Sequence, residues 1–232
     1  MDELNLAQRI AIWVLPVLFG ITVHEVAHGW VARQLGDPTA MMLGRLTLNP
    51  LKHIDPFGTV LVPGILLLFG GVIFGWARPV PVTWQNLKQP KRDMALVALA
   101  GPCANLLMAI GWALLVKTGV VLHGGFSWIA EPLIFMGIAG IFINTILLVL
   151  NLFPLPPLDG GRVLAGLLPN RLAWQLGRIE PYGLIILLVL LFSGVLAKVI
   201  WPFISMVQVA LSFLAGIPSE VFQAVLLMLF GA

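Results

Sequence analysis

The sequence has little charge for its length. Only 10% of its 232 residues are Asp, Glu, Lys or Arg, whereas soluble domains carry about 25%. Hydrophobic residues make up 59%, and 24 glycines come in addition. A soluble chain of this size could not bury so much apolar surface and still present a charged exterior. The composition therefore excludes a soluble enzyme, a disordered protein and a nucleic-acid-binding protein, and it indicates a multi-pass membrane protein.

Cysteine is almost absent as well. The single residue, Cys103, excludes an internal disulfide framework and a zinc site built from cysteines. Basic residues are missing from the first positions, which read Met1-Asp2-Glu3, whereas a signal peptide needs a basic n-region. We therefore expect the first apolar stretch, Ile10–Ala32, to be a retained helix.

Several long apolar runs are present. About 20 apolar residues cross the hydrocarbon core of a bilayer as a helix. We therefore interpret the chain as an all-α polytopic membrane protein of one domain, with about five transmembrane helices. A further apolar stretch, Pro218–Phe230, is shorter and is expected to lie at the interface or to pack on a partner. The five spans are expected over Ile10–Val31, Met94–Val116, Pro132–Phe153, Tyr182–Val199 and, shorter, Trp201–Ala215.

One apolar segment is interrupted. Phe57–Trp76 contains Pro63-Gly64 and Gly70-Gly71, so we expect a re-entrant hairpin that enters and leaves on the same face. On either side, Met41–Leu48 and Pro79–Trp84 are rich in β-formers or in prolines that disfavour helix. These two segments are predicted to be short, membrane-associated β-strands.

Ionisable residues within the first expected helix suggest a functional site, because such groups are costly in a membrane. His24 and His28 are four residues apart and share one helix face, which suits two zinc ligands. Glu25 lies beside them, where it can act as the base for a zinc-bound water. The alternative is that two buried histidines form hydrogen bonds between helices.

A zinc centre of this kind needs a third protein ligand and an open position for water. The candidate is Asp159, which follows a Pro-rich stretch and precedes Gly160-Gly161. Irregular backbone at membrane depth is tolerated where it is buried in protein or lines a wet cavity. The alternative is a plain interfacial Asp-Gly turn. The sequence thus predicts one Zn²⁺ per chain.

Three motifs in this order give the chain a family resemblance. HEVAHGW, GPCAN (Gly101–Asn105) and NLFPLPPLDGGR (Asn151–Arg162) resemble the site-2 protease family of intramembrane zinc metalloproteases. LNPLKHIDPFG (Leu48–Gly58) and RPVPV (Arg78–Val82) resemble its small prokaryotic members without a PDZ domain. The resemblance covers residues 1–162, expected to be the catalytic membrane core, whereas residues 163–232 are expected to form C-terminal transmembrane or interfacial helices.

The resemblance implies a role for each matching residue. Glu25 would be the general base and then the proton donor to the leaving amine, and Asn105 would line the site. The zinc ligands would be His24, His28 and Asp159. The residues that shape the substrate path would be Asn151, Pro154 and Pro156.

Two further residues have two interpretations each. Asn144 lies seven residues before Asn151, so both share one helix face; it either contributes to the site or packs between helices. His53 could stabilise the oxyanion of the reaction, or it could be a histidine hydrogen-bonded in an interfacial turn.

The expected ligand positions constrain the topology. His24 and His28 lie late in the first helix and Asp159 follows the third, so these two helices must cross the membrane in the same direction. The hairpin then leaves ten of the 13 basic residues on one side, which the positive-inside rule assigns to the cytoplasm. We expect a prokaryotic cell-membrane protein whose N-terminus lies outside and whose active site faces the cytoplasm. The ten residues are Arg33, Arg45, Lys52, Arg78, Lys88, Lys91, Arg92, Arg162, Arg171 and Arg178.

The sequence therefore favours a metalloprotease that cleaves membrane-protein substrates in or near their transmembrane segments. Its expected partners are these substrates and the lipid bilayer, without nucleic acid; the sequence does not predict an oligomeric state. Two alternatives belong to other classes. Broken helices with ligands near the midplane are also found in transporters, and a membrane scaffold could keep zinc for folding alone.

Overall fold

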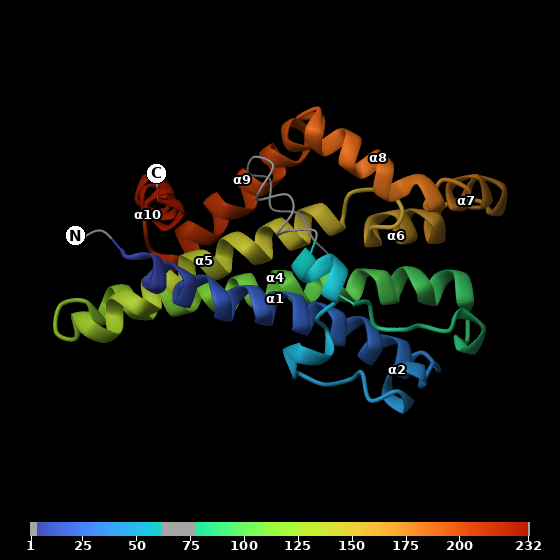
Figure 1. Ribbon diagram of the computed structural model, residues 1–232, viewed down its shortest axis with the longest axis horizontal. Helices are drawn as coiled ribbons and strands as arrows, with labels where there is room; N and C mark the ends of the chain where they lie inside the picture. Colours follow the sequence, from blue (N-terminus) through green and yellow to red (C-terminus); the bar gives the residue numbers. More distant parts are fainter. Residues whose placement is uncertain (1–3, 62–77, 232) are drawn as a thin grey trace.

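The fold is a bundle of long helices. A computed structural model describes residues 4–61 and 78–231, and all regular structure within these ranges is helical (Figure 1). Its centre consists of α1 (Leu6–Gln34), α4 (Pro90–Leu122) and α5 (Ser127–Asn151), which contact one another. Figure 1 shows α1 and α5 running in the same direction and α4 running opposite to both. This is the arrangement that the ligand positions required.

Local sequence signals fix where the long helices begin. At α1, the Asn5 side chain accepts a hydrogen bond from the Gln8 N–H (3.0 Å), and the Gln8 side chain accepts one from the Asn5 N–H (2.9 Å). This capping box satisfies two backbone donors that the first turn would leave free. Helix α4 begins at Pro90, whose fixed φ suits the first helical position.

Small residues let α4 and α5 pack closely. A Cβ on Gly137 would lie 2.4 Å from Val116, and one on Gly140 would lie 2.3 Å from the Trp112 ring. Ala109 and Ala113 of α4 are fully buried in the same core. Close approach through small residues is how helices gain contact in a membrane, where lipid is as apolar as the side chains.

The C-terminal part differs from the sequence prediction in one boundary. The expected span Tyr182–Val199 is interrupted, because α8 (Glu180–Phe192) ends and α9 (Val195–Ala215) begins after Gly194. Gly194 has φ +73°, a left-handed conformation that glycine adopts without a Cβ penalty. The prediction of one continuous helix there was wrong, and the expected Trp201–Ala215 helix is the later part of α9.

The last helix packs onto the chain's own core. The ring of Phe230, in α10 (Ser219–Phe230), lies 5.2 Å from the Trp13 ring and 5.3 Å from the Phe142 ring. The aromatic contact joins α10 to α1 and α5. In Figure 1, α10 therefore lies at the end of the bundle where α1 begins.

Over residues 4–61 and 78–231, four helices are long and apolar enough to cross a membrane by length and composition: α1, α4, α5 and α9. A fifth span is present if α7 (Asn170–Gly177) and α8 are taken as one, although they are bent by 65°. This agrees with the prediction of a polytopic membrane protein with about five spans.

The predicted β-strands are not confirmed. Within the described residues, Met41 and Met42 belong to a short helix, α2 (Thr39–Met42), and no strand is present over either predicted segment. Residues 78–83 are extended, but the N–H groups of Val80 and Thr83 donate to side-chain carboxylates and not to a neighbouring strand. The 3₁₀ turn η3 (Trp84–Asn86) follows them.

The predicted hairpin Phe57–Trp76 lies mostly outside the described residues. Its described beginning is a π-helical turn, η2 (Pro56–Leu61), which follows the 3₁₀ turn η1 (Pro50–Lys52).

Asp37 ties the end of α1 to the extended segment. It is buried, and it accepts hydrogen bonds from the Thr39 hydroxyl, the Asn86 amide (3.0 Å) and the Thr83 N–H (2.6 Å). Burial alone raises the pKa of Asp37, but the hydrogen bonds from Thr39, Asn86 and Thr83 outweigh it. The net pKa therefore lies below the ordinary value of 3.8.

Replacing Asp37 with Asn should lower the stability of the protein by about 1–3 kcal/mol, since hydrogen bonds to a buried charge are lost. In the wild type this contribution should be complete above about pH 5 and disappear as the pH falls below 3.8 through the lowered pKa. Thermal unfolding in detergent, followed by tryptophan fluorescence at several pH values, measures both effects. The exposed Glu131→Gln is the matched control. Equal melting temperatures for Asp37→Asn and the wild type at pH 7 would contradict this role.

Candidate metal centre

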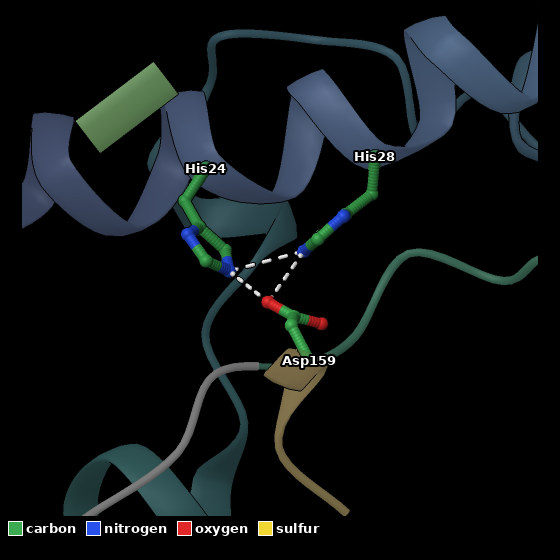
Figure 2. A group of neighbouring side chains, drawn as sticks. All are labelled: His24, His28 and Asp159. Atoms are coloured by element: carbon green, nitrogen blue, oxygen red, sulfur yellow. Dashed lines mark hydrogen bonds and ion pairs between the residues drawn. The ribbon is translucent and has the colours of Figure 1, made fainter. Parts of the chain in front are cut away.

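Three predicted ligands meet in the bundle. His24 and His28 lie one turn apart on α1, and Asp159 is the first residue of α6 (Asp159–Leu167). The His24 Nε2 and His28 Nε2 atoms are 3.0 Å apart, and each lies 3.2 Å from Asp159 Oδ2. All three residues are buried. Figure 2 shows both imidazole rings pointing toward the carboxylate.

The outer hydrogen bonds of the histidines fix which nitrogen faces the centre. The His24 Nδ1–H donates to Asn105 Oδ1 (2.6 Å), and the His28 Nδ1–H donates to the Val97 carbonyl (2.7 Å). In the neutral form each Nε2 then carries a lone pair. Asp159 Oδ2 is buried without a hydrogen-bond donor. Three electron-pair donors thus converge on one point, an arrangement that a cation stabilises.

The spacing and chemistry fit zinc. A tetrahedral zinc ion with bonds of about 2.1 Å separates its ligand atoms by roughly 3.4 Å, close to the observed 3.0–3.2 Å. Two imidazoles and one carboxylate form a ligand set that zinc accepts, and three protein ligands leave the fourth position for water or substrate.

Helix α4 can approach the histidines because Gly101 has no side chain. A Cβ at this position would lie 2.5 Å from His24 Cε1 and 2.5 Å from His28 Nε2. Any other residue at position 101 would displace the ligands. The close approach of the two histidines explains why the first residue of the GPCAN motif is a glycine.

Asn105, four residues further along α4, organises a polar network. Its Nδ2 donates to the Gly20 carbonyl (3.1 Å) and to Asn144 Oδ1 (2.9 Å), while its Oδ1 accepts the hydrogen bond from the His24 Nδ1–H. The Asn144 Nδ2 in turn donates to the Gly140 carbonyl (2.9 Å). Asn144 therefore lies between α4 and α5, where it is hydrogen-bonded to Asn105, and a contribution of Asn144 to the site stays a prediction. Both asparagines are fully buried.

The loop between α5 and α6 places Asp159. A Cβ on Gly160 would lie 2.2 Å from the Leu152 carbonyl oxygen, and one on Gly161 would lie 2.3 Å from the Pro156 nitrogen. The two glycines let α6 begin directly against the preceding turn, so that Asp159 faces α1.

The residues predicted to shape a substrate path occupy this loop in different ways. Asn151 is the last residue of α5 and donates to the Leu147 carbonyl (2.9 Å). Pro154 is exposed, whereas Pro156 is buried beneath Gly161.

Glu25 lies outside the group of ligands. It is half-buried, and its Oε2 accepts a hydrogen bond from the Val80 N–H (2.8 Å) of the extended segment. The other carboxylate oxygen is not used in this bond.

His53 is not part of the metal group. It is buried, and its Nε2–H donates to the Thr47 carbonyl (2.9 Å) within a turn. Its Nδ1 is buried without a hydrogen-bond partner, and a role of His53 in the reaction stays a prediction. The contributions of the Val97 carbonyl and the Val80 N–H were missed, because backbone groups leave no signal in the residue types.

Comparison with known proteins gives close relatives. The chain is 41% identical to YwhC of Bacillus subtilis, which carries a zinc metalloprotease name, over 83% of this chain and 85% of the relative. It is 31% identical to Rip2 of Mycolicibacterium smegmatis, with the same kind of name, over 85% of this chain and 74% of the relative. MJ0611 of Methanocaldococcus jannaschii, again named as a zinc metalloprotease, is 30% identical over 62% of this chain and 64% of the relative.

No family model and no solved structure matches the chain. The relatives nevertheless extend across the bundle, and their names agree with the metal that the two histidines and Asp159 can hold. The chain belongs to the site-2 protease family of zinc metalloproteases, and zinc is its cofactor.

Proposed function

We propose that this protein is an intramembrane metalloprotease that hydrolyses peptide bonds in or near the transmembrane segments of membrane proteins. The observation that carries the proposal is the position of the metal group. Two of its ligands and Glu25 belong to α1, a helix long and apolar enough to span a membrane. A peptide bond that reaches this group is therefore drawn from a segment in or next to the bilayer.

The residues divide the chemistry between them. His24, His28 and Asp159 hold the metal, which when bound supplies Lewis-acid activation of water and of the scissile carbonyl. Glu25 removes a proton from the attacking water while the water oxygen bonds to the carbonyl carbon. The carbon–nitrogen bond then breaks, and Glu25 returns the proton to the leaving amine. The products are a carboxylic acid and an amine, and transfer of the acid's proton to the amine then gives a carboxylate and an ammonium group.

The surrounding residues keep these groups in position. Asn105 holds the His24 ring through Nδ1, and the Val80 N–H holds one oxygen of Glu25. We assign Asn151 and Pro154 to the substrate path, because they border the loop that carries Asp159. Pro156 supports that path from beneath, where it contacts Gly161.

The substitution Glu25→Gln should lower the cleavage rate at least about 100-fold, because the general base is lost. It should retain one zinc per chain, since Glu25 is not a ligand. The assay uses purified protein in detergent with a panel of single-span substrates, and zinc is measured by mass spectrometry. Chelation should abolish wild-type cleavage, and added zinc should restore it. The exposed Glu220→Gln should cleave normally.

A variant that binds zinc and cleaves as well as the wild type would contradict the role of Glu25. Zinc binding by the wild type without cleavage of any substrate in the panel would favour a metal carrier or scaffold.

The substitution Asn105→Ala should weaken zinc binding by about 10- to 100-fold, because His24 loses the partner that orients its ring. Competition with a zinc-binding dye measures the affinity, and circular dichroism checks that the helices remain. Thr118→Ala, an exposed position on the same helix, is the control. Unchanged zinc affinity in a folded Asn105→Ala protein would show that the hydrogen bond to His24 does not support the metal.

We also propose that the N-terminus lies outside the cell and the metal centre toward the cytoplasm, because ten basic residues then face the cytoplasm. In a Cys103→Ala background, a cysteine at exposed position 88 should react with an impermeant thiol reagent only after the cells are opened. A cysteine at exposed position 123, beyond the other end of α4, should react in intact cells. The reverse pattern would contradict this orientation.

A further inference from the structure

A basic cavity adjoins the segment that holds Glu25. It has a volume of about 560 Å³ and is lined by Arg45, Lys52 and Arg78 together with leucine, isoleucine and proline side chains. None of its described lining residues is acidic. The cavity therefore gathers three positive charges without a negative one among these residues.

The cations are held in place by neutral groups. Arg45 Nη2 donates to the carbonyls of Arg78 (2.9 Å) and Pro79 (3.5 Å), and Lys52 Nζ donates to the Gly44 carbonyl (3.3 Å). Arg45 Nε is buried without a hydrogen-bond partner. Carbonyl oxygens orient these groups but do not balance their charge.

The surroundings of Arg45 disfavour the charged form of its side chain. Burial lowers the pKa of its guanidinium, and the positive charge of Arg78 lowers it further. The charge of Glu25 raises it in part, without restoring the ordinary value. An anion in the cavity would relieve the repulsion between the two guanidinium groups.

The cavity is connected to Glu25 through a short stretch of backbone. Arg78 and Pro79 line it, and the next residue, Val80, donates its N–H to Glu25. Two residues of extended chain span at most about 7 Å. An anionic group in the cavity therefore lies beside the segment that fixes the carboxylate proposed to act on the scissile bond.

We propose that this cavity is a substrate subsite that binds the carboxylate side chain of a Glu or Asp residue near the scissile bond. This inference rests on the proposed function. The apolar part of the lining, including Leu43 and Leu51, suits the methylene stem of a glutamate. Contact with the Glu25-holding segment favours a substrate side chain over an anionic lipid headgroup, which has no reason to be next to the catalytic carboxylate.

Fluorescent apolar peptides that carry one Glu at successive positions, with a matched Gln series, test the proposal. Their binding to zinc-loaded Glu25→Gln protein in detergent is measured by anisotropy, so it does not depend on cleavage. At one or two positions the Glu peptide should bind about two- to fivefold more tightly than its Gln counterpart, as expected for a partly exposed ion pair. Equal binding of the two series at every position would overturn the proposal.

Changes at Arg78 separate recognition from structure. Adding Arg78→Gln should remove the preference for Glu, and Arg78→Glu should transfer it to a peptide with Lys at that position. A merely structural role would weaken all peptides alike, and this outcome would refute the subsite. Arg33→Gln, an equal loss of charge at an exposed position outside the cavity, should keep the preference.

Two further arms distinguish the sources of failure. In nanodiscs of neutral or anionic phospholipid, the preference for Glu should persist; its disappearance only in anionic lipid would assign the cavity to headgroups and overturn the proposal. Cleavage of the same peptides by the wild type should show the preference in kcat/KM. If the peptides are not cleaved but the binding preference for Glu is retained, the proposed protease function is refuted and the anion-binding subsite is supported.

Discussion

The convergence of three electron-pair donors on one buried point is the constraint on which the structure depends. His24, His28 and Asp159 lie among helices too apolar to solvate them, and their facing atoms repel one another unless a cation lies between them. Several close contacts around the group support this arrangement. Gly101 gives the rings room, and Asn105 fixes the orientation of His24.

The same constraint explains the order of the long helices. The ligands on α1 lie near its end, and Asp159 directly follows the loop after α5, so the two helices must run in parallel with α4 between them in the chain. α4 then supplies partners to both histidines and shares the polar network with α5. Because α1 and α5 run in the same direction, residues late in α1 and directly after α5 lie at the same level of the bundle, where they form the metal group.

Much of this site could be predicted from residue types, because buried charge in an apolar helix has few explanations. The pair His24 and His28 was predicted from its spacing, and the parallel helices were predicted from the positions of the ligands. Asp159 was proposed from its Pro- and Gly-rich surroundings and from the family resemblance. The Gly194 break was missed, since one glycine within an apolar run gives little warning of a left-handed residue. The two strands were predicted from residue preference, but Val80 and Thr83 use their N–H groups on carboxylates instead of on a neighbouring strand.

Gly101 has a consequence for motion. Any sliding or rotation of α4 against α1 would bring other atoms of α4 onto the metal ligands, because the space beside His24 and His28 fits only a residue without a Cβ. The α1–α4 pair therefore behaves as one rigid wall. The third ligand comes from the other side of the group, where Asp159 begins α6. Any movement of α6 away from α1 would therefore separate Asp159 from His24 and His28.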